Sequence, residues 1–144
     1  MRRIWITFLW ILCLGTVLNC SSIARVNPQL NREWMLVSFK DYTKEELIRN
    51  QAKIDLTAPS EHGKIKGGAF MGCNKMFFTA AFKKDGTVKF SDIGSTLMAC
   101  RDMKLEHDFA RNFGTMQYFK LEGHFLILND NWGNTMKYIA SDWD

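Results

Sequence analysis

Residues 72–100 read GCNKMFFTAAFKKDGTVKFSDIGSTLMAC. Near the centre, Asp85-Gly86 separates two arms that are rich in apolar residues, and this dipeptide in that setting is the strongest short-range signal for a β-hairpin. We therefore expect strands at about 76–83 and 87–91. Because a hairpin brings the residues on its two sides together, Cys73 and Cys100 should lie close in space.

Several segments before this hairpin also favour strands. Residues 33–39 are rich in aromatic and aliphatic side chains, and 53–57 alternate polar and apolar residues. A further strand is expected at 65–71. Between the first two strands, Thr43 followed by acids is a good helix start, which predicts a short helix or turn at 43–47.

After the hairpin the apolar period changes. Three apolar residues recur at four-residue steps, which predicts one helix at about 102–114: Leu105, Phe109 and Phe113. Strands are expected to follow at 115–121, 124–129 and 135–140. Many short strands with one helix predict a mainly β (α+β) fold, in which a small antiparallel sheet curls into a half-open barrel with one packed helix.

Composition and charge narrow the class of protein. The chain has 144 residues, of which 47% are hydrophobic and 13% aromatic, and this predicts one ordered domain. The formal net charge is +4. It falls to +2 without Arg2 and Arg3, which we place in a leader that is removed. Such a mild balance argues against a nucleic-acid partner.

The first residues are typical of a secretory leader. Met1-Arg2-Arg3 is cationic, and the uncharged apolar run at 4–18 is shorter than the roughly 20 residues that a membrane-spanning helix needs. We interpret residues 1–19 as a signal peptide of the lipoprotein type. An uncleaved membrane anchor is the alternative.

The end of the leader resembles a bacterial lipobox. Residues 17–22 read VLNCSS, so Cys20 is the expected lipidation site, bearing acyl chains such as palmitate. The alternative is ordinary cleavage after Ala24, within a small-x-small sequence. If Cys20 is lipidated, residues 20–32 tether the anchor to a folded domain at 33–144. We expect an outer-membrane, lipid-anchored protein that faces the periplasm; cleavage after Ala24 would make it soluble in the periplasm or secreted.

Two cysteines remain for the folded domain. In an oxidising compartment Cys73 and Cys100 are expected to form a structural disulfide, although two buried thiols or a reactive or metal-binding pair are alternatives. A cysteine enzyme would need a base beside the thiol, and its candidates are only the three histidines of the chain: His62, His107 and His124. No Cys-x-x-Cys or paired-histidine spacing indicates zinc. We predict no enzymatic activity, no cofactor and no metal.

These residues also resemble a known family. The ordered series Gly72-Cys73-Asn74, Thr96-x-Met98-Ala99-Cys100 and Glu106-x-x-Phe109 is similar to the META domain of HslJ-like proteins. The pattern extends to further positions: Trp34-x-Leu36, Tyr118, Leu121-x-Gly123, Leu126-x-Leu128 and Met136-x-Tyr138. The resemblance covers about 34–138 and implies a small β domain of envelope lipoproteins, linked to heat shock or envelope stress. It supplies no catalytic residues.

The motif residues are interpreted as structural. Asn74 should satisfy backbone groups at a turn, Glu106 should hydrogen-bond near the helix start, and Phe109 should fill the core. The remaining motif positions are Gly72, Thr96, Met98 and Ala99.

Three functions are compatible with these observations. The first is a non-enzymatic, stress-linked envelope lipoprotein that acts by protein or envelope contact. It would be a monomer held to the membrane by its lipid anchor, and its partner would be an unknown envelope protein. The second is a carrier of a small apolar ligand inside the barrel. The third is a cysteine-dependent enzyme. Trp132 and Trp143 could add an exposed partner patch, or they could close the ends of the sheet.

Overall fold

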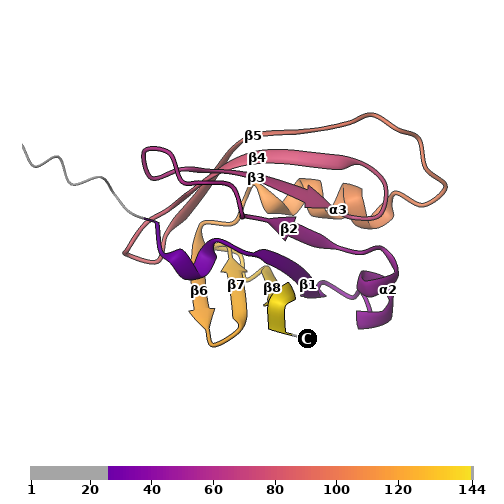
Figure 1. Ribbon diagram of the computed structural model, residues 1–144. Coiled ribbons are helices and arrows are strands. Elements are labelled where there is room, and N and C mark those ends of the chain that lie inside the picture. Colours follow the sequence, from indigo (N-terminus) through magenta and orange to yellow (C-terminus); the bar gives the residue numbers. More distant parts are fainter. Residues whose placement is uncertain (1–25, 144) are drawn as a thin grey trace, which may run out of the picture.

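The computed structural model describes residues 26–143 (Figure 1). The predicted signal peptide, the lipidation residue Cys20 and the alternative cleavage site after Ala24 lie outside the described residues.

The described chain forms eight strands, two α-helices and two short 3-10 helices. In order they are η1 (Pro28–Leu30), β1 (Glu33–Phe39), α2 (Lys44–Arg49), β2 (Lys53–Asp55), β3 (Ile65–Phe70), β4 (Lys75–Phe82), β5 (Val88–Ser95), α3 (Lys104–Phe113), β6 (Tyr118–Glu122), β7 (Phe125–Asn129), β8 (Thr135–Ala140) and η2 (Ser141–Trp143).

One antiparallel sheet contains all eight strands in the order β5-β4-β3-β2-β1-β8-β7-β6. The sheet curls until its two edges meet at the start of β5 and β6. There the Val88 amide donates to the Gln117 carbonyl and the Phe119 amide to the Gly86 carbonyl, both at 2.8 Å. We call this contact the seam. The predicted mainly β half-barrel with one packed helix is confirmed.

The predicted hairpin is present, because β4 and β5 pair across the Asp85-Gly86 turn. Along β4 the inward-facing side chains are apolar and buried: Met76, Phe78, Ala80 and Phe82. The register between the two strands shifts where Asp92 takes a positive φ of 51°. Pairing resumes after this bulge, so β5 continues to Ser95, beyond the predicted end at residue 91.

Helix α3 packs along the β3–β5 part of the sheet (Figure 1). Its predicted apolar stripe is buried, and the Phe113 ring lies 4.8 Å from the Phe78 ring and 4.1 Å from the Phe90 ring, between centroids. The helix starts at Lys104 rather than at 102. Asp102 stays outside the helix, and its carboxylate accepts the Lys104 amide at 3.1 Å.

The packed domain begins earlier than predicted. Within the predicted tether at 20–32, Leu30 is fully buried, and its carbonyl accepts the Trp34 indole N–H at 3.1 Å. Burial of an aliphatic side chain and pairing of an indole both hold this segment on the domain. Residues from Asn27 onward therefore belong to the fold.

Candidate functional site

A buried amide and a buried carboxylate organise one end of the molecule. Asn74 lies at the start of β4 and Glu106 in the first turn of α3, with 1% and 5% of their surface exposed. The Glu106 carboxylate accepts the Asn74 backbone amide at 2.6 Å and the Asn74 side-chain amide at 2.8 Å. This bidentate contact ties the β3–β4 turn to the helix.

The same asparagine holds the segment that follows β5. Its side-chain oxygen accepts the Thr96 hydroxyl at 2.8 Å and the Met98 amide at 2.7 Å, and its NH2 group also donates to the Met98 carbonyl at 3.1 Å. Both donors and both lone pairs of the Asn74 amide are therefore used. We call Asn74, Thr96, Met98 and Glu106 the polar network. It holds the loop at 96–101, the tip loop, in one position.

A disulfide adds a covalent link at the same place. Cys73 and Cys100 are bonded, with their Cα atoms 6.1 Å apart. Cys73 is buried and Cys100 is exposed. The predicted pairing is present, and neither sulfur is a thiol that could act as a nucleophile. The disulfide joins the β3–β4 turn to the far side of the tip loop.

The other motif residues surround this arrangement. Gly72 has a φ of +109°, and a Cβ atom there would lie 2.4 Å from the Asn50 side-chain oxygen, so the position suits glycine for two reasons. Phe109 is fully buried and stacks on Phe113 at 4.7 Å between centroids. Ala99 is exposed in the tip loop.

The tip loop displays large apolar side chains to solvent. Leu97 is 96% exposed and Met98 is 54% exposed, although the Met98 backbone is fixed by Asn74. Phe77, on the outward face of β4 close to the loop, is 58% exposed. Exposed apolar side chains that gather on one surface mark interaction sites more often than single ones do. The sequence pointed instead to Trp132 and Trp143, which are also exposed.

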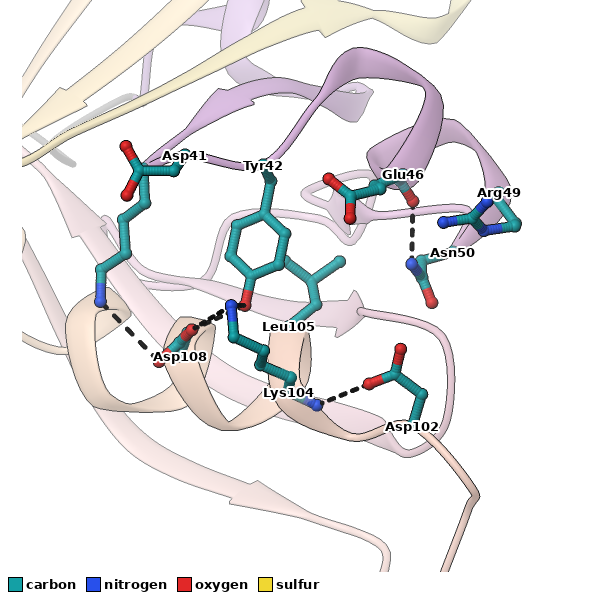
Figure 2. A pocket seen from close by; sticks show the side chains of 10 residues that line it. Asp41, Tyr42, Glu46, Arg49, Asn50, Asp102, Lys104, Leu105 and Asp108 are labelled. Carbon is teal, nitrogen blue, oxygen red and sulfur yellow. Dashed lines mark hydrogen bonds and ion pairs between the residues drawn. The ribbon is translucent and has the colours of Figure 1, made fainter.

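A second feature is a cleft of about 210 Å³ between the β1–α2 connection and α3. Figure 2 shows Tyr42 pointing across it toward Asp108 on α3. The Tyr42 hydroxyl donates to the Asp108 carboxylate at 2.6 Å, and Arg111 donates to the other oxygen at 2.7 Å. Lys40 and Lys104 lie within 3.9 Å of the same carboxylate.

The protonation states in this cleft favour a structural role for the hydrogen-bonded pair Tyr42 and Asp108, which we call the clasp. Burial, together with the hydrogen bond to Asp108, raises the pKa of Tyr42 well above its usual value. The hydrogen bond from Tyr42 lowers the pKa of Asp108. At neutral pH the hydroxyl therefore keeps its proton and the carboxylate stays ionised, while both carboxylate oxygens already accept hydrogen bonds.

Two further findings concern the described residues alone. No helix between residues 26 and 143 is long and apolar enough to cross a bilayer. The same part of the chain contains no cluster of three His, Cys, Asp or Glu side chains that could hold a metal ion.

Comparisons with known proteins agree with this fold. A protein from Burkholderia xenovorans, solved by NMR, is 19% identical with a TM-score of 0.59, and the match covers 88% of this chain and 98% of that one. A second NMR structure is 17% identical with a TM-score of 0.61, covering 82% and 97%. At these identities the likeness concerns the fold. No curated protein matches the chain.

The family comparison reaches further. The family model of the META domain matches residues 27–143, which include every described strand and helix. The match also includes the disulfide and the four residues of the polar network, as the motif series in the sequence indicates. The chain belongs to the META domain family.

Proposed function

We propose that this protein is a lipid-anchored envelope domain, linked to stress, that acts by contact rather than by catalysis. The observation that carries the proposal is the tip loop, where Leu97 is almost fully exposed on a backbone that the polar network and the disulfide hold still. A preorganised apolar surface loses little conformational entropy when it meets a partner. A rigid loop of this kind serves binding.

The groups with chemical potential are already engaged. Both sulfurs lie in the disulfide, and Glu106 and Asn74 satisfy each other in a buried pair. His62 and His107 are exposed on the surface. These observations support a non-enzymatic role, because a nucleophile needs an activating base and a free reactive atom.

The interior of the half-barrel favours contact over ligand carriage. Aromatic rings meet there at centroid distances between 4.1 and 5.6 Å, and the residues concerned are Phe78, Phe90, Phe109 and Phe113. Side chains of this size fill the interior of a small barrel.

Acyl labelling tests the anchor. When the full chain is produced in a bacterium with labelled palmitate, we expect the label on the wild-type protein and the protein in the outer-membrane fraction. Cys20→Ala should remove both the label and the membrane location. Cys13→Ala is the matched control, because Cys13 would leave with the signal peptide, and it should keep both. An unlabelled mature protein that begins at Arg25 would contradict the anchor.

The stress link is tested separately. The protein level is measured before and after a heat shift and after an envelope stress, and we expect it to rise. An unchanged level under both treatments would refute this part of the proposal while leaving the anchor intact.

A further inference from the structure

The outward face of β3, β4 and β5 combines positive charge with apolar side chains. Register places Lys66 opposite Thr79 and Lys89 opposite Ala81, so both lysines share the outward face of β4 with Lys75 and Phe77. The tip loop continues this surface, since the Thr96 amide donates to the Lys75 carbonyl at 3.0 Å. We call the following set the basic face: Lys66, Lys75, Phe77, Lys89, Leu97 and Met98.

Cations outnumber carboxylates on and around the basic face. Its three lysines are exposed, and Arg101 adds a further exposed cation at the end of the tip loop. On β3–β5 the outward carboxylate is Asp92, Asp102 follows just after the loop, and the exposed Asp55 on β2 borders the face opposite Gly68. Asp102 is partly engaged, because it accepts the Lys104 amide. The balance favours an anionic partner.

The apolar members indicate what kind of anionic partner. Leu97 and Met98 are apolar without an aromatic ring, lie on a fixed loop and are 96% and 54% exposed. Aliphatic side chains flanked by lysine and arginine are the pattern of a surface that lies in a membrane interface, where the apolar groups enter the acyl boundary and the cations meet anionic headgroups. A nucleic acid would offer no acyl layer for Leu97 to enter.

The length of chain before the domain agrees with this geometry. From Cys20 to Val26 the backbone can reach about 20 Å, so a lipid at Cys20 would keep the domain beside the bilayer. Figure 1 places the indigo start of the domain and the loop after β5 at opposite ends of the view, with β3–β5 running between them.

We propose that the basic face docks onto the anionic lipid surface of the membrane that holds the anchor. The proposal rests on the proposed lipid anchor only for the identity of that membrane. Docking would fix the orientation of the domain relative to the bilayer.

Vesicle flotation tests the docking without the anchor. The mature chain from residue 20, with Cys20→Ser to prevent acylation, is mixed with vesicles of phosphatidylcholine alone or with about a third of phosphatidylglycerol. We expect roughly tenfold or stronger partitioning to the anionic vesicles, because several cations each contribute. Leu97→Ser should lower this binding by roughly tenfold, and Lys75→Gln by roughly fivefold.

Matched variants exclude general effects. Ile48→Ser removes an exposed apolar side chain from α2, and Lys84→Gln removes a charge from the β4–β5 turn; both should bind as the parent does. Thermal unfolding of each variant verifies that it is folded. Because Leu97 is exposed, Leu97→Ser should unfold at the same temperature as the parent. Equal binding to both vesicle types, or equal losses in the control variants, would overturn the docking. An absence of any vesicle binding would overturn it too, and would leave the face to an acidic protein. Palmitate labelling at Cys20 is independent of all these results.

Discussion

Replacing Glu106 by glutamine changes one atom of the polar network and gives a sharp test of its role. Each carboxylate oxygen of Glu106 accepts an N–H from Asn74, one from the backbone at 2.6 Å and one from the side chain at 2.8 Å. A glutamine amide has one oxygen and one NH2 group. Whichever way it turns, the NH2 group must face an N–H donor of Asn74.

The cost follows from these contacts. One charge-assisted hydrogen bond becomes a neutral one, and the other becomes a donor–donor contact in a place where both residues are at most 5% exposed. A bond to a charged group contributes about 1.5–3 kcal/mol, and a buried donor without a partner costs about 1–3 kcal/mol. We expect Glu106→Gln to lower the free energy of unfolding by about 3 kcal/mol. For a domain of this size that corresponds to roughly 10 °C in Tm.

Urea denaturation at neutral pH measures the change, with an unchanged slope as evidence that unfolding stays two-state. Glu45→Gln, at an exposed position in α2, is the matched control and should cost at most about 0.5 kcal/mol. Asn74→Asp places an acceptor opposite the new NH2 group but gives up the hydrogen bond to the Met98 carbonyl, so the double variant should lose less stability than the two single changes added together. If Glu106→Gln is as stable as the control, the network does not hold this end of the domain.

Three further predictions concern the disulfide, the clasp and the turn. Changing both Cys73 and Cys100 to serine should lower the free energy of unfolding by roughly 3.5 kcal/mol through loop entropy, measured by urea denaturation. Tyr42→Phe removes the main cause of the lowered pKa of Asp108. The stability that this lowered pKa provides is present above about pH 4 and is lost as pH falls through the folded-state pKa. Urea denaturation at a series of pH values should therefore show that the free energies of unfolding of wild type and Tyr42→Phe become more similar in acid. Gly72→Ala should cost about 2 kcal/mol, through the positive φ and the crowding against Asn50, and should lower Tm.

The glycine and tyrosine predictions each have a control within the chain. Gly133→Ala shares a positive φ of 88° but meets no atom within 4 Å, so it should cost less than Gly72→Ala. Tyr118→Phe, at an exposed tyrosine, should show no such pH dependence. A serine double variant as stable as wild type, or a Tyr42→Phe penalty that is constant with pH, would contradict the corresponding reasoning.

Local signals in the sequence predicted most of the fold. Asp85-Gly86 marked the β4–β5 turn, and the four-residue spacing of Leu105, Phe109 and Phe113 marked α3, because both signals depend on neighbours in the chain. The bulge at Asp92 was not predictable, since a positive φ at aspartate depends on the register of the whole pair. The seam joins segments about 30 residues apart, and no periodicity encodes such a contact.

The candidate site was predicted in part. The motif series singled out Asn74 and Glu106 as structural residues. It does not say that the one asparagine side chain hydrogen-bonds both to α3 and to the tip loop. Leu97 gave no signal at all. Leucine is usually buried, and only the structure shows that Leu97 is 96% exposed beside a backbone that Asn74 fixes at Met98.

The position of β1 has a consequence for how the protein is made. This first strand lies in the middle of the sheet and pairs with β8, the last one. The pairing of β1 with β8 therefore cannot form until β8 has left the ribosome, and contacts between such distant segments form slowly. If the leader directs export as we propose, this slow pairing favours export of an extended chain, because the core closes only after β8 is in place.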